Sequence, residues 1–354
     1  MEELLIQWRE SLRKQDLAAR AAAQRQWDSI AKPLGSLGAL EKLVMDIAAL
    51  TGNPHVDISQ RAVVVCCADN GVVAEGVTQT GQEVTARMAE EMVRMHSSVC
   101  RMAETAHADV IPVDFGMVRP VEGVLNRRVM SGTEDMARRP SMTREQALQA
   151  MAYGVDLVKD LKEQGYSLLI SGEMGIGNTT TSSALVAALL NLPAEPVTGR
   201  GAGLSDAGLQ RKIWAIERAI AVNRPDPNDP LDVLSKLGGL DICGMAGLFI
   251  GGAIQGVPVI IDGFISAVAA LMAQKLCPGA EIAMVASHCS EEPAAKRVLT
   301  ILNKYPIIFA NMRLGEGTGG VCLLPMLDMA LAVYGGTTFD QVGMEAYTPQ
   351  GGKS

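Results

Sequence analysis

Aromatic residues, histidines and paired cysteines are all scarce in this chain. Only 4% of its 354 residues are Phe, Trp or Tyr, and none of its four histidines is three or four positions from another. The sequence therefore lacks the closely spaced histidine ligands typical of a zinc site, and no metal is expected. The seven cysteines are an odd number without a Cys-x-x-Cys motif, which favours reduced thiols over disulfides.

Dense positive charge and long uninterrupted apolar segments are missing too. The formal net charge is -8, and no Lys/Arg cluster marks a surface for nucleic acid or an anionic membrane. The most apolar stretch, 245–264, holds five glycines, a proline and Asp262, which fits a buried helix and strand better than a membrane span. The N-terminus lacks the features of a signal peptide, so we expect a cytoplasmic protein with small-molecule partners.

What the chain does have is an alternation of short apolar segments with helical ones. Residues 2–26 and 39–51 show helical spacing without a strand signal, which predicts a helical appendage. After them, β-branched runs suited to buried strands alternate with helices, and this pattern predicts a doubly wound α/β fold, a mainly parallel sheet with helices on both faces. The predicted strands are 62–67, 110–114, 167–170, 195–198, 257–261 and 282–286.

Polar residues follow these strands. Singly, residues such as Asp114 and Asp262 are more often turn formers or helix caps than site residues. Their recurrence at many strand ends favours a ligand site at the carboxyl edge of the sheet, where open α/β sheets bind ligands. The segments concerned are 69–71, 114–116, 171–173, 199–201, 262–263 and 287–288.

Two glycine-rich segments suit a phosphate. Residues 171–183 follow a strand and open a helix, so backbone N–H groups, Asn178 and the hydroxyls of 179–183 could hold one phosphate. No Gly-Lys-[Ser/Thr] follows, so this is not a triphosphate loop, and an ordinary capped helix would look similar. Residues 199–204 lead into a helix carrying Lys212, which could donate to a phosphate or simply face solvent.

A third segment, 312–321, contains four glycines and Glu316 between two apolar elements. This many glycines implies positive φ angles or a close approach of the backbone to a ligand. The spacing of Gly315, Gly317 and Gly320 matches the dinucleotide fingerprint, but a carboxylate there would repel the pyrophosphate. We therefore interpret Glu316 as a catalytic group, and a solvated loop glutamate is the alternative.

These loops resemble those of nicotinate-nucleotide:dimethylbenzimidazole phosphoribosyltransferases, which build the lower nucleotide loop of cobalamin. The resemblance extends over nearly the whole chain, from 32–38 onward. It is carried by Gly-Glu-Met-Gly-Ile-Gly-Asn-Thr-Thr at 172–180, Gly-Arg-Gly-Ala-Gly-Leu at 199–204 and Arg-Leu-Gly-Glu-Gly-Thr-Gly at 313–319, and by segments 68–77, 232–239 and 262–264.

The resemblance implies transfer of the 5-phosphoribosyl group of nicotinate mononucleotide to 5,6-dimethylbenzimidazole or a related base, giving α-ribazole 5'-phosphate and nicotinate. Glu316 matches the family's catalytic glutamate, expected to accept a proton from the attacking base, and Glu173 matches a second one. The groups expected to contact the phosphoribosyl moiety are Gly175, Asn178, Thr179, Gly201, Gly203 and Lys212. Those expected at the base are Thr78, Gln79, Gln82 and Leu314.

The resemblance also implies a large α/β domain over 56–321, a small helical domain over 1–55 completed by 322–354, and a homodimer whose partner helps to close the site. No cofactor is expected, because nicotinate bonded to ribose is a pyridinium and already an activated leaving group. Two other classes stay open: a non-catalytic module that senses a mononucleotide, and a nucleotidase or dehydrogenase on the same type of sheet.

Of the two loop carboxylates, we expect Glu316 to be the proton acceptor, because the flanking glycines leave its side chain uncrowded. We expect Glu173 mainly to order its loop or a site water. A positioned general base of this kind typically contributes about 10²–10⁴-fold to a rate.

Overall fold

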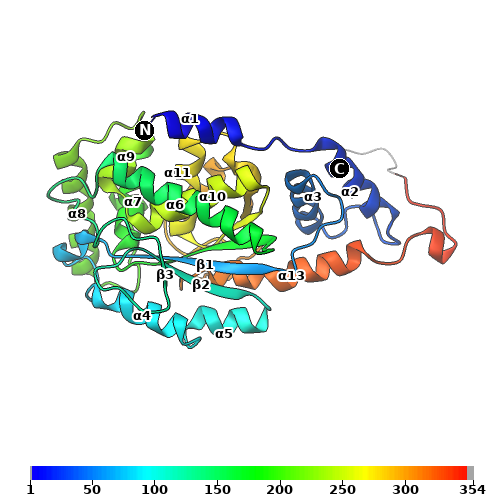
Figure 1. Ribbon diagram of the computed structural model, residues 1–354, viewed down its shortest axis with the longest axis horizontal. Coiled ribbons are helices and arrows are strands. Elements are labelled where there is room, and N and C mark those ends of the chain that lie inside the picture. The colour runs from blue at the N-terminus through cyan, green and yellow to red at the C-terminus, as the bar shows by residue number, and fades with distance from the viewer. Residues whose placement is uncertain (1, 349–354) are drawn as a thin grey trace.

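The structure, a computed structural model, describes residues 2–348 and has two unequal parts (Figure 1). The larger part is an α/β body, and a smaller lobe of helices extends from one end of it. Among the described residues, no helix is both long and apolar enough to cross a membrane.

A six-stranded sheet forms the centre of the body. All of its strand pairs are parallel, in the order β3-β2-β1-β4-β5-β6. Every residue of β1 is buried, as expected for a parallel strand covered on both faces. The chain winds outward from β1 in one direction and then from β4 in the other, so the carboxyl ends of these two strands form a topological switch point. The strands are β1 (Arg61–Ala68), β2 (Asp109–Gly116), β3 (Leu125–Asn126), β4 (Leu168–Met174), β5 (Val259–Ile261) and β6 (Met284–Ala286).

Helices cover both faces of the sheet, which confirms the predicted doubly wound class. Alternate residues of β1 join different cores: Cys66 packs in the core that contains α10, and Cys67 in the core that contains α4, α5 and α13. On the first face lie α10 (Leu240–Gln255) and α11 (Phe264–Leu276), with α6 (Arg144–Glu163) packed on α10; on the second lie α4 (Glu83–Val93), α5 (Ser98–Thr105) and α13 (Thr318–Tyr334).

Helix α10 is almost entirely buried, and glycines set how closely it packs. A Cβ atom on Gly154 of α6 would clash with the backbone oxygen of Gly244 in α10, so the two helix backbones touch directly. The first turn of α10 reaches the carboxyl edge of the sheet, where Asp241 accepts a hydrogen bond from Asn178 Nδ2 at 3.0 Å. The remaining helices of the body are α7 (Asn178–Leu189), α8 (Asp206–Asn223), α9 (Pro230–Leu237) and α12 (Ala295–Ile301).

One predicted strand is wrong. Residues 195–198 do not join the sheet: Glu195–Val197 form a short 3-10 helix between α7 and α8. Pro196 has no N–H to donate to a neighbouring strand, and it suits the first turn of a helix, where that donor is not needed. The other five predicted strands are confirmed as β1, β2, β4, β5 and β6.

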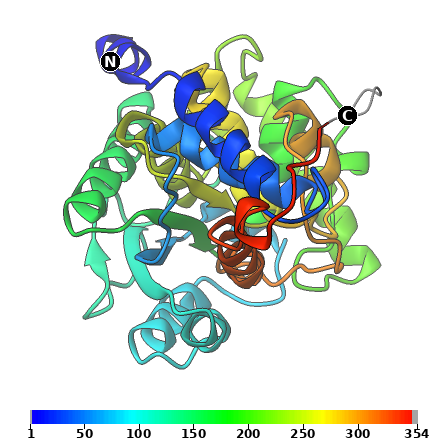
Figure 2. The same ribbon diagram turned by 90° about the vertical axis from the view of Figure 1, so that its right-hand side faces the viewer.

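The lobe is built from both ends of the chain. Its core joins α2 (Leu17–Ser29) and α3 (Ala39–Thr51) to the end of α13, with the Trp27 and Tyr334 ring centroids 4.8 Å apart. In Figure 2 the lobe faces the viewer and α13 is seen end on. Helix α1 (Glu2–Ser11) instead lies along the body, where Arg9 Nε donates to the Leu276 carbonyl at 2.8 Å. The domain boundaries, 1–55 with 322–354 against 56–321, stay a prediction, and residues 349–354 lie outside the described part.

Candidate active site

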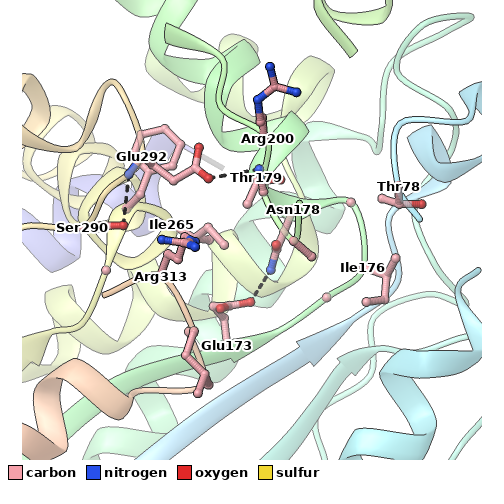
Figure 3. Close-up of a pocket in the computed structure, with 18 of the residues that line it drawn as sticks. Thr78, Glu173, Ile176, Asn178, Thr179, Arg200, Ile265, Ser290, Glu292 and Arg313 are labelled. Carbon is pink, nitrogen blue, oxygen red and sulfur yellow. Dashed lines mark hydrogen bonds between the residues drawn. The ribbon is translucent and has the colours of Figure 1, made fainter. Parts of the chain in front are cut away.

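A pocket of about 290 Å³ lies beyond the carboxyl ends of β4, β5 and β6, and all three glycine-rich loops contribute to its wall (Figure 3). This is the edge of the sheet at which the sequence predicts a ligand site. Of the predicted site residues, those that line the pocket are Thr78, Gln79, Glu173, Gly175, Asn178, Thr179, Gly201, Lys212 and Leu314; Gln82, Gly203 and Glu316 do not line it.

One end of the pocket, here called the cationic end, is formed by Thr179, Gly201 and Lys212. The Lys212 side chain is completely buried, and its Nζ donates to Thr179 Oγ1 at 2.8 Å and to the Gly199 carbonyl at 3.0 Å. Burial lowers the pKa of Lys212 to about 8, so the amine still carries a proton at neutral pH. A buried cation beside a backbone N–H and a hydroxyl can bind an anion.

Of residues 179–183, whose hydroxyl groups were predicted to hold the phosphate, only Thr179 lines the pocket. Thr179 lines it, whereas Thr180, Ser182 and Ser183 are turned into the interior, where their hydroxyl oxygens are buried and lack a hydrogen-bond partner. The reason is helical geometry: α7 begins at Asn178, so successive residues point in different directions around its axis.

The opposite end, here called the carboxylate end, centres on Glu173 at the end of β4. Asn178 Nδ2 donates both to Glu173 Oε2 and to Asp241 Oδ2, the latter at 3.0 Å, so one amide joins two buried carboxyl groups. Burial raises the pKa of Glu173 to about 8 and that of Asp241 to about 6. Glu173 is therefore mostly protonated at neutral pH and can donate a hydrogen bond into the pocket.

Glu316 is close to the pocket but faces away from it. Gly315 lines the wall, whereas the Glu316 carboxylate is buried and accepts from the Val99 N–H, at the start of α5, at 3.3 Å. Burial raises the pKa of Glu316. Its φ of 60° is left-handed, a conformation that costs a non-glycine residue about 1–3 kcal/mol and therefore needs support from its surroundings.

That support comes from Asp262, which follows β5. Its carboxylate accepts from the backbone N–H groups of Gly317, Gly319 and Gly320 at 3.1, 2.7 and 3.1 Å. Asp262 thus holds the start of α13 and, through it, the Glu316 turn. Despite these hydrogen bonds, burial raises the pKa of Asp262 to about 7.

The segment predicted to contact the base, residues 78–82, is hydrogen-bonded to the glycine-rich loop at 199–204. Gln79 Nε2 donates to the carbonyls of Ala202 and Gly203, which ties residues 77–80 to the loop at 199–204. Gln82 turns inward and donates to the Asn70 carbonyl at 3.1 Å. Within residues 2–348, no three His, Cys, Asp or Glu side chains are grouped as metal ligands would be.

Comparison with known proteins gives one consistent family. A phosphoribosyltransferase family model matches residues 12–344. Nicotinate-nucleotide–dimethylbenzimidazole phosphoribosyltransferase of Acetivibrio thermocellus is 44% identical over 92% of this chain and 94% of its own, and that of Roseiflexus sp. is 44% identical over 93% and 94%. The crystal structure of CobT from Thermus thermophilus superposes with a TM-score of 0.88 at 38% identity, covering 93% of this chain and 99% of that one. The chain belongs to this phosphoribosyltransferase family.

Several pocket residues of this phosphoribosyltransferase were not among the predicted site residues. His288, Ser290, Glu292 and Arg313 line the cavity, and Asp241 lies directly beneath it. His288 follows β6, and its segment, 287–288, was among the strand ends that the sequence singled out, although no role was assigned to the residue. No sequence signal marked Asp241 as a site residue. It is in the first turn of a buried helix, where an acidic residue is common whether or not it has a function.

Proposed function

We propose that the protein transfers the 5-phosphoribosyl group of nicotinate mononucleotide to 5,6-dimethylbenzimidazole or a related base, giving α-ribazole 5'-phosphate and nicotinate in cobalamin biosynthesis. The observation that carries the proposal is the division of one pocket into a cationic end and a carboxylate end. A mononucleotide has an anionic phosphate and a reacting carbon at opposite sides of its ribose, and this division matches both.

The phosphate binds at the cationic end. Lys212, the Gly201 N–H and Thr179 supply a charge and two donors, and Gly175 and Asn178 position the first loop against the ribose. The phosphate contacts are the same before and after reaction, so this end contributes to binding rather than to the chemical step. Gly203, which lies outside the pocket wall, acts through the loop that it shares with Gly201.

The chemistry takes place at the carboxylate end. One benzimidazole nitrogen forms a bond to the ribose carbon while the bond from that carbon to nicotinate breaks and nicotinate leaves with the electron pair. The other nitrogen releases its proton to Glu316. This assignment requires the Glu316 side chain to turn from the Val99 N–H toward the bound base. Burial raises the pKa of Glu173 to about 8, so at neutral pH it is mostly protonated and mainly donates a hydrogen bond, which leaves Glu316 as the principal acceptor.

The base lies against Thr78, Gln79 and Leu314. Leu314 is 53% exposed in the free protein, and Gln79 is fixed by the loop at 199–204. Gln82 supports this segment from behind through Asn70. An apolar side chain beside polar ones suits a flat heteroaromatic base.

We also propose a cytoplasmic homodimer. Large apolar side chains are exposed on and near the lobe, among them Leu17 at 70% and Met329 at 62%, and such surface favours association. All seven cysteines are free, which fits a reducing compartment. Light scattering coupled to size-exclusion chromatography tests the dimer; a monomer at micromolar concentration contradicts it.

The activity is tested by incubating the protein with nicotinate mononucleotide and 5,6-dimethylbenzimidazole and separating the products by chromatography. We expect free nicotinate and one new nucleotide in equal amounts. A protein that binds the mononucleotide but releases no nicotinate with any benzimidazole or purine base would be a sensing module instead. Stabilisation by NAD at low concentration would point to a dehydrogenase.

A further inference from the structure

Glu292 places a carboxylate in the cationic end of the pocket. Its Oε1 accepts from the Gly201 N–H at 3.1 Å, and this N–H is one of the donors that we assign to the phosphate. Its Oε2 is buried and has no hydrogen-bond partner. Figure 3 shows the side chain reaching from the turn after Ser290 toward the loop beside Thr179.

The loop is shaped to receive this anion. A Cβ atom on Gly199 would overlap Glu292 Oε2, so the loop backbone lies directly against the carboxylate. Glu292 also acts on the buried amine of Lys212: burial lowers the pKa of that amine, and the negative charge of Glu292 opposes the shift. In the free protein, Glu292 thus supplies part of the countercharge that Lys212 needs.

A bound phosphate cannot share this place with Glu292. A phosphate monoester carries about -1.5 to -2 charges near neutral pH, so the two anions would repel each other beside a single lysine. Both would also need the same Gly201 N–H. Glu292 is in a turn between β6 and α12 and is only half-buried, which leaves the side chain a route outward.

We propose that Glu292 is a displaceable occupant of the phosphate site: its carboxylate holds the Gly201 N–H in the free protein and leaves when a phosphate monoester enters. This inference rests on the proposed function. It adds that a side chain of the protein itself competes with the substrate phosphate for the same site. Substrate and product both carry the 5'-phosphate, so the returning carboxylate weakens the binding of both and speeds release of the product.

The test is titration calorimetry of the full-length protein with ribose 5-phosphate, comparing wild type with Glu292→Gln and Glu292→Ala. Without a carboxylate to displace from the Gly201 N–H, both variants should bind at least about tenfold more tightly, because breaking a charge-assisted hydrogen bond costs a factor of about this order or more. The dissociation constant for α-ribazole 5'-phosphate should fall in parallel. Glu291→Gln is the matched control: Glu291 is the exposed neighbour, and its removal changes net charge equally.

Binding by Glu292→Gln and Glu292→Ala that is no tighter than that of wild type, in variants that melt normally, overturns the proposal. Equal tightening in Glu291→Gln overturns it too, since the effect would then be one of net charge. The proposed function can fail separately: tighter ribose 5-phosphate binding in a protein that never releases nicotinate rejects that function alone. Normal nicotinate release without tightening rejects only the role of Glu292.

Discussion

The two ends of the pocket handle buried charge in opposite ways. At the cationic end, one lysine is completely buried, yet it stays protonated because Thr179, Gly199 and the charge of Glu292 support it. At the carboxylate end, Glu173, Asp241 and Asp262 are buried close to one another, and burial raises the pKa of each. The first end keeps a fixed charge for holding an anion. The second keeps carboxyl groups near their titration range, which is what proton transfer requires.

The largest expected effect comes from removing basicity at the carboxylate end. Glu316→Gln keeps the shape and can still accept from the Val99 N–H, so mononucleotide binding and thermal stability should stay close to wild type. The kcat should fall by at least about 10²-fold, because the amide cannot take the proton. Steady-state rates beside calorimetric binding measure both quantities. If Glu316→Gln is within a few-fold of wild type while Glu173→Gln is inactive, the two carboxylates have been assigned in reverse.

The next effect belongs to the cationic end. Lys212→Ala removes a charge-assisted contact worth about 1.5–3 kcal/mol, so the KM for nicotinate mononucleotide should rise roughly 10- to 150-fold. The kcat should change little, because the contact is made equally in ground and transition states. Initial rates over a wide range of mononucleotide concentration separate the two. A lowered kcat at unchanged KM would put Lys212 at the reacting carbon.

A smaller effect is expected from Glu173→Gln, whose amide resembles the protonated carboxyl group. The kcat should fall by less than in Glu316→Gln. Stability should respond to pH: burial raises the pKa of folded Glu173 to about 8, while in the unfolded chain this carboxyl group has its ordinary pKa of 4.5. Over this window the unfolded state binds fewer protons, so wild type loses stability as pH rises. The variant lacks this loss, and its melting temperature relative to wild type should be higher at about pH 8 than at about pH 5. An unchanged difference between the two pH values contradicts a protonated Glu173.

Reduction of the cysteines is expected to have no effect on activity. All seven cysteines are free, and five of them, including Cys66 and Cys67, are buried. Burial raises the pKa of both neighbouring thiols, which keeps them unreactive. Activity should therefore be the same with and without strong reductant, with seven thiols counted by alkylation after denaturation. Inactivation by reductant alone would mean that a disulfide is needed.

The layered fold followed from local sequence because a buried parallel strand is apolar along its whole length. The runs at 62–67 and 257–261 show this: the first lies within β1, and the last 3 residues of the second form β5. The segment 195–198 is not apolar throughout: only Val197 and Thr198 are β-branched, and it forms a short 3-10 helix whose first turn suits Pro196. Positive φ angles in the third loop were also predictable, since glycines flank Glu316 on both sides.

The site was predictable in its loops but not in its contacts. That Lys212 is buried cannot be read from a helix in which lysine usually faces solvent. That Glu316 rests on Val99, 217 positions away along the chain, depends on how α5 and α13 pack. The link from Glu173 through Asn178 to Asp241 likewise joins β4, α7 and α10, and no local pattern encodes it.

A double-mutant cycle on kcat/KM tests most directly whether the two ends act separately. It compares Lys212→Ala, Glu316→Gln and the double variant with wild type, using nicotinate mononucleotide and 5,6-dimethylbenzimidazole. If Lys212 only holds the phosphate and Glu316 only accepts the proton, the two losses add within about 0.5 kcal/mol. A coupling energy well above about 1 kcal/mol would mean that one end acts through the other, and the division of this pocket into binding and chemistry would be wrong.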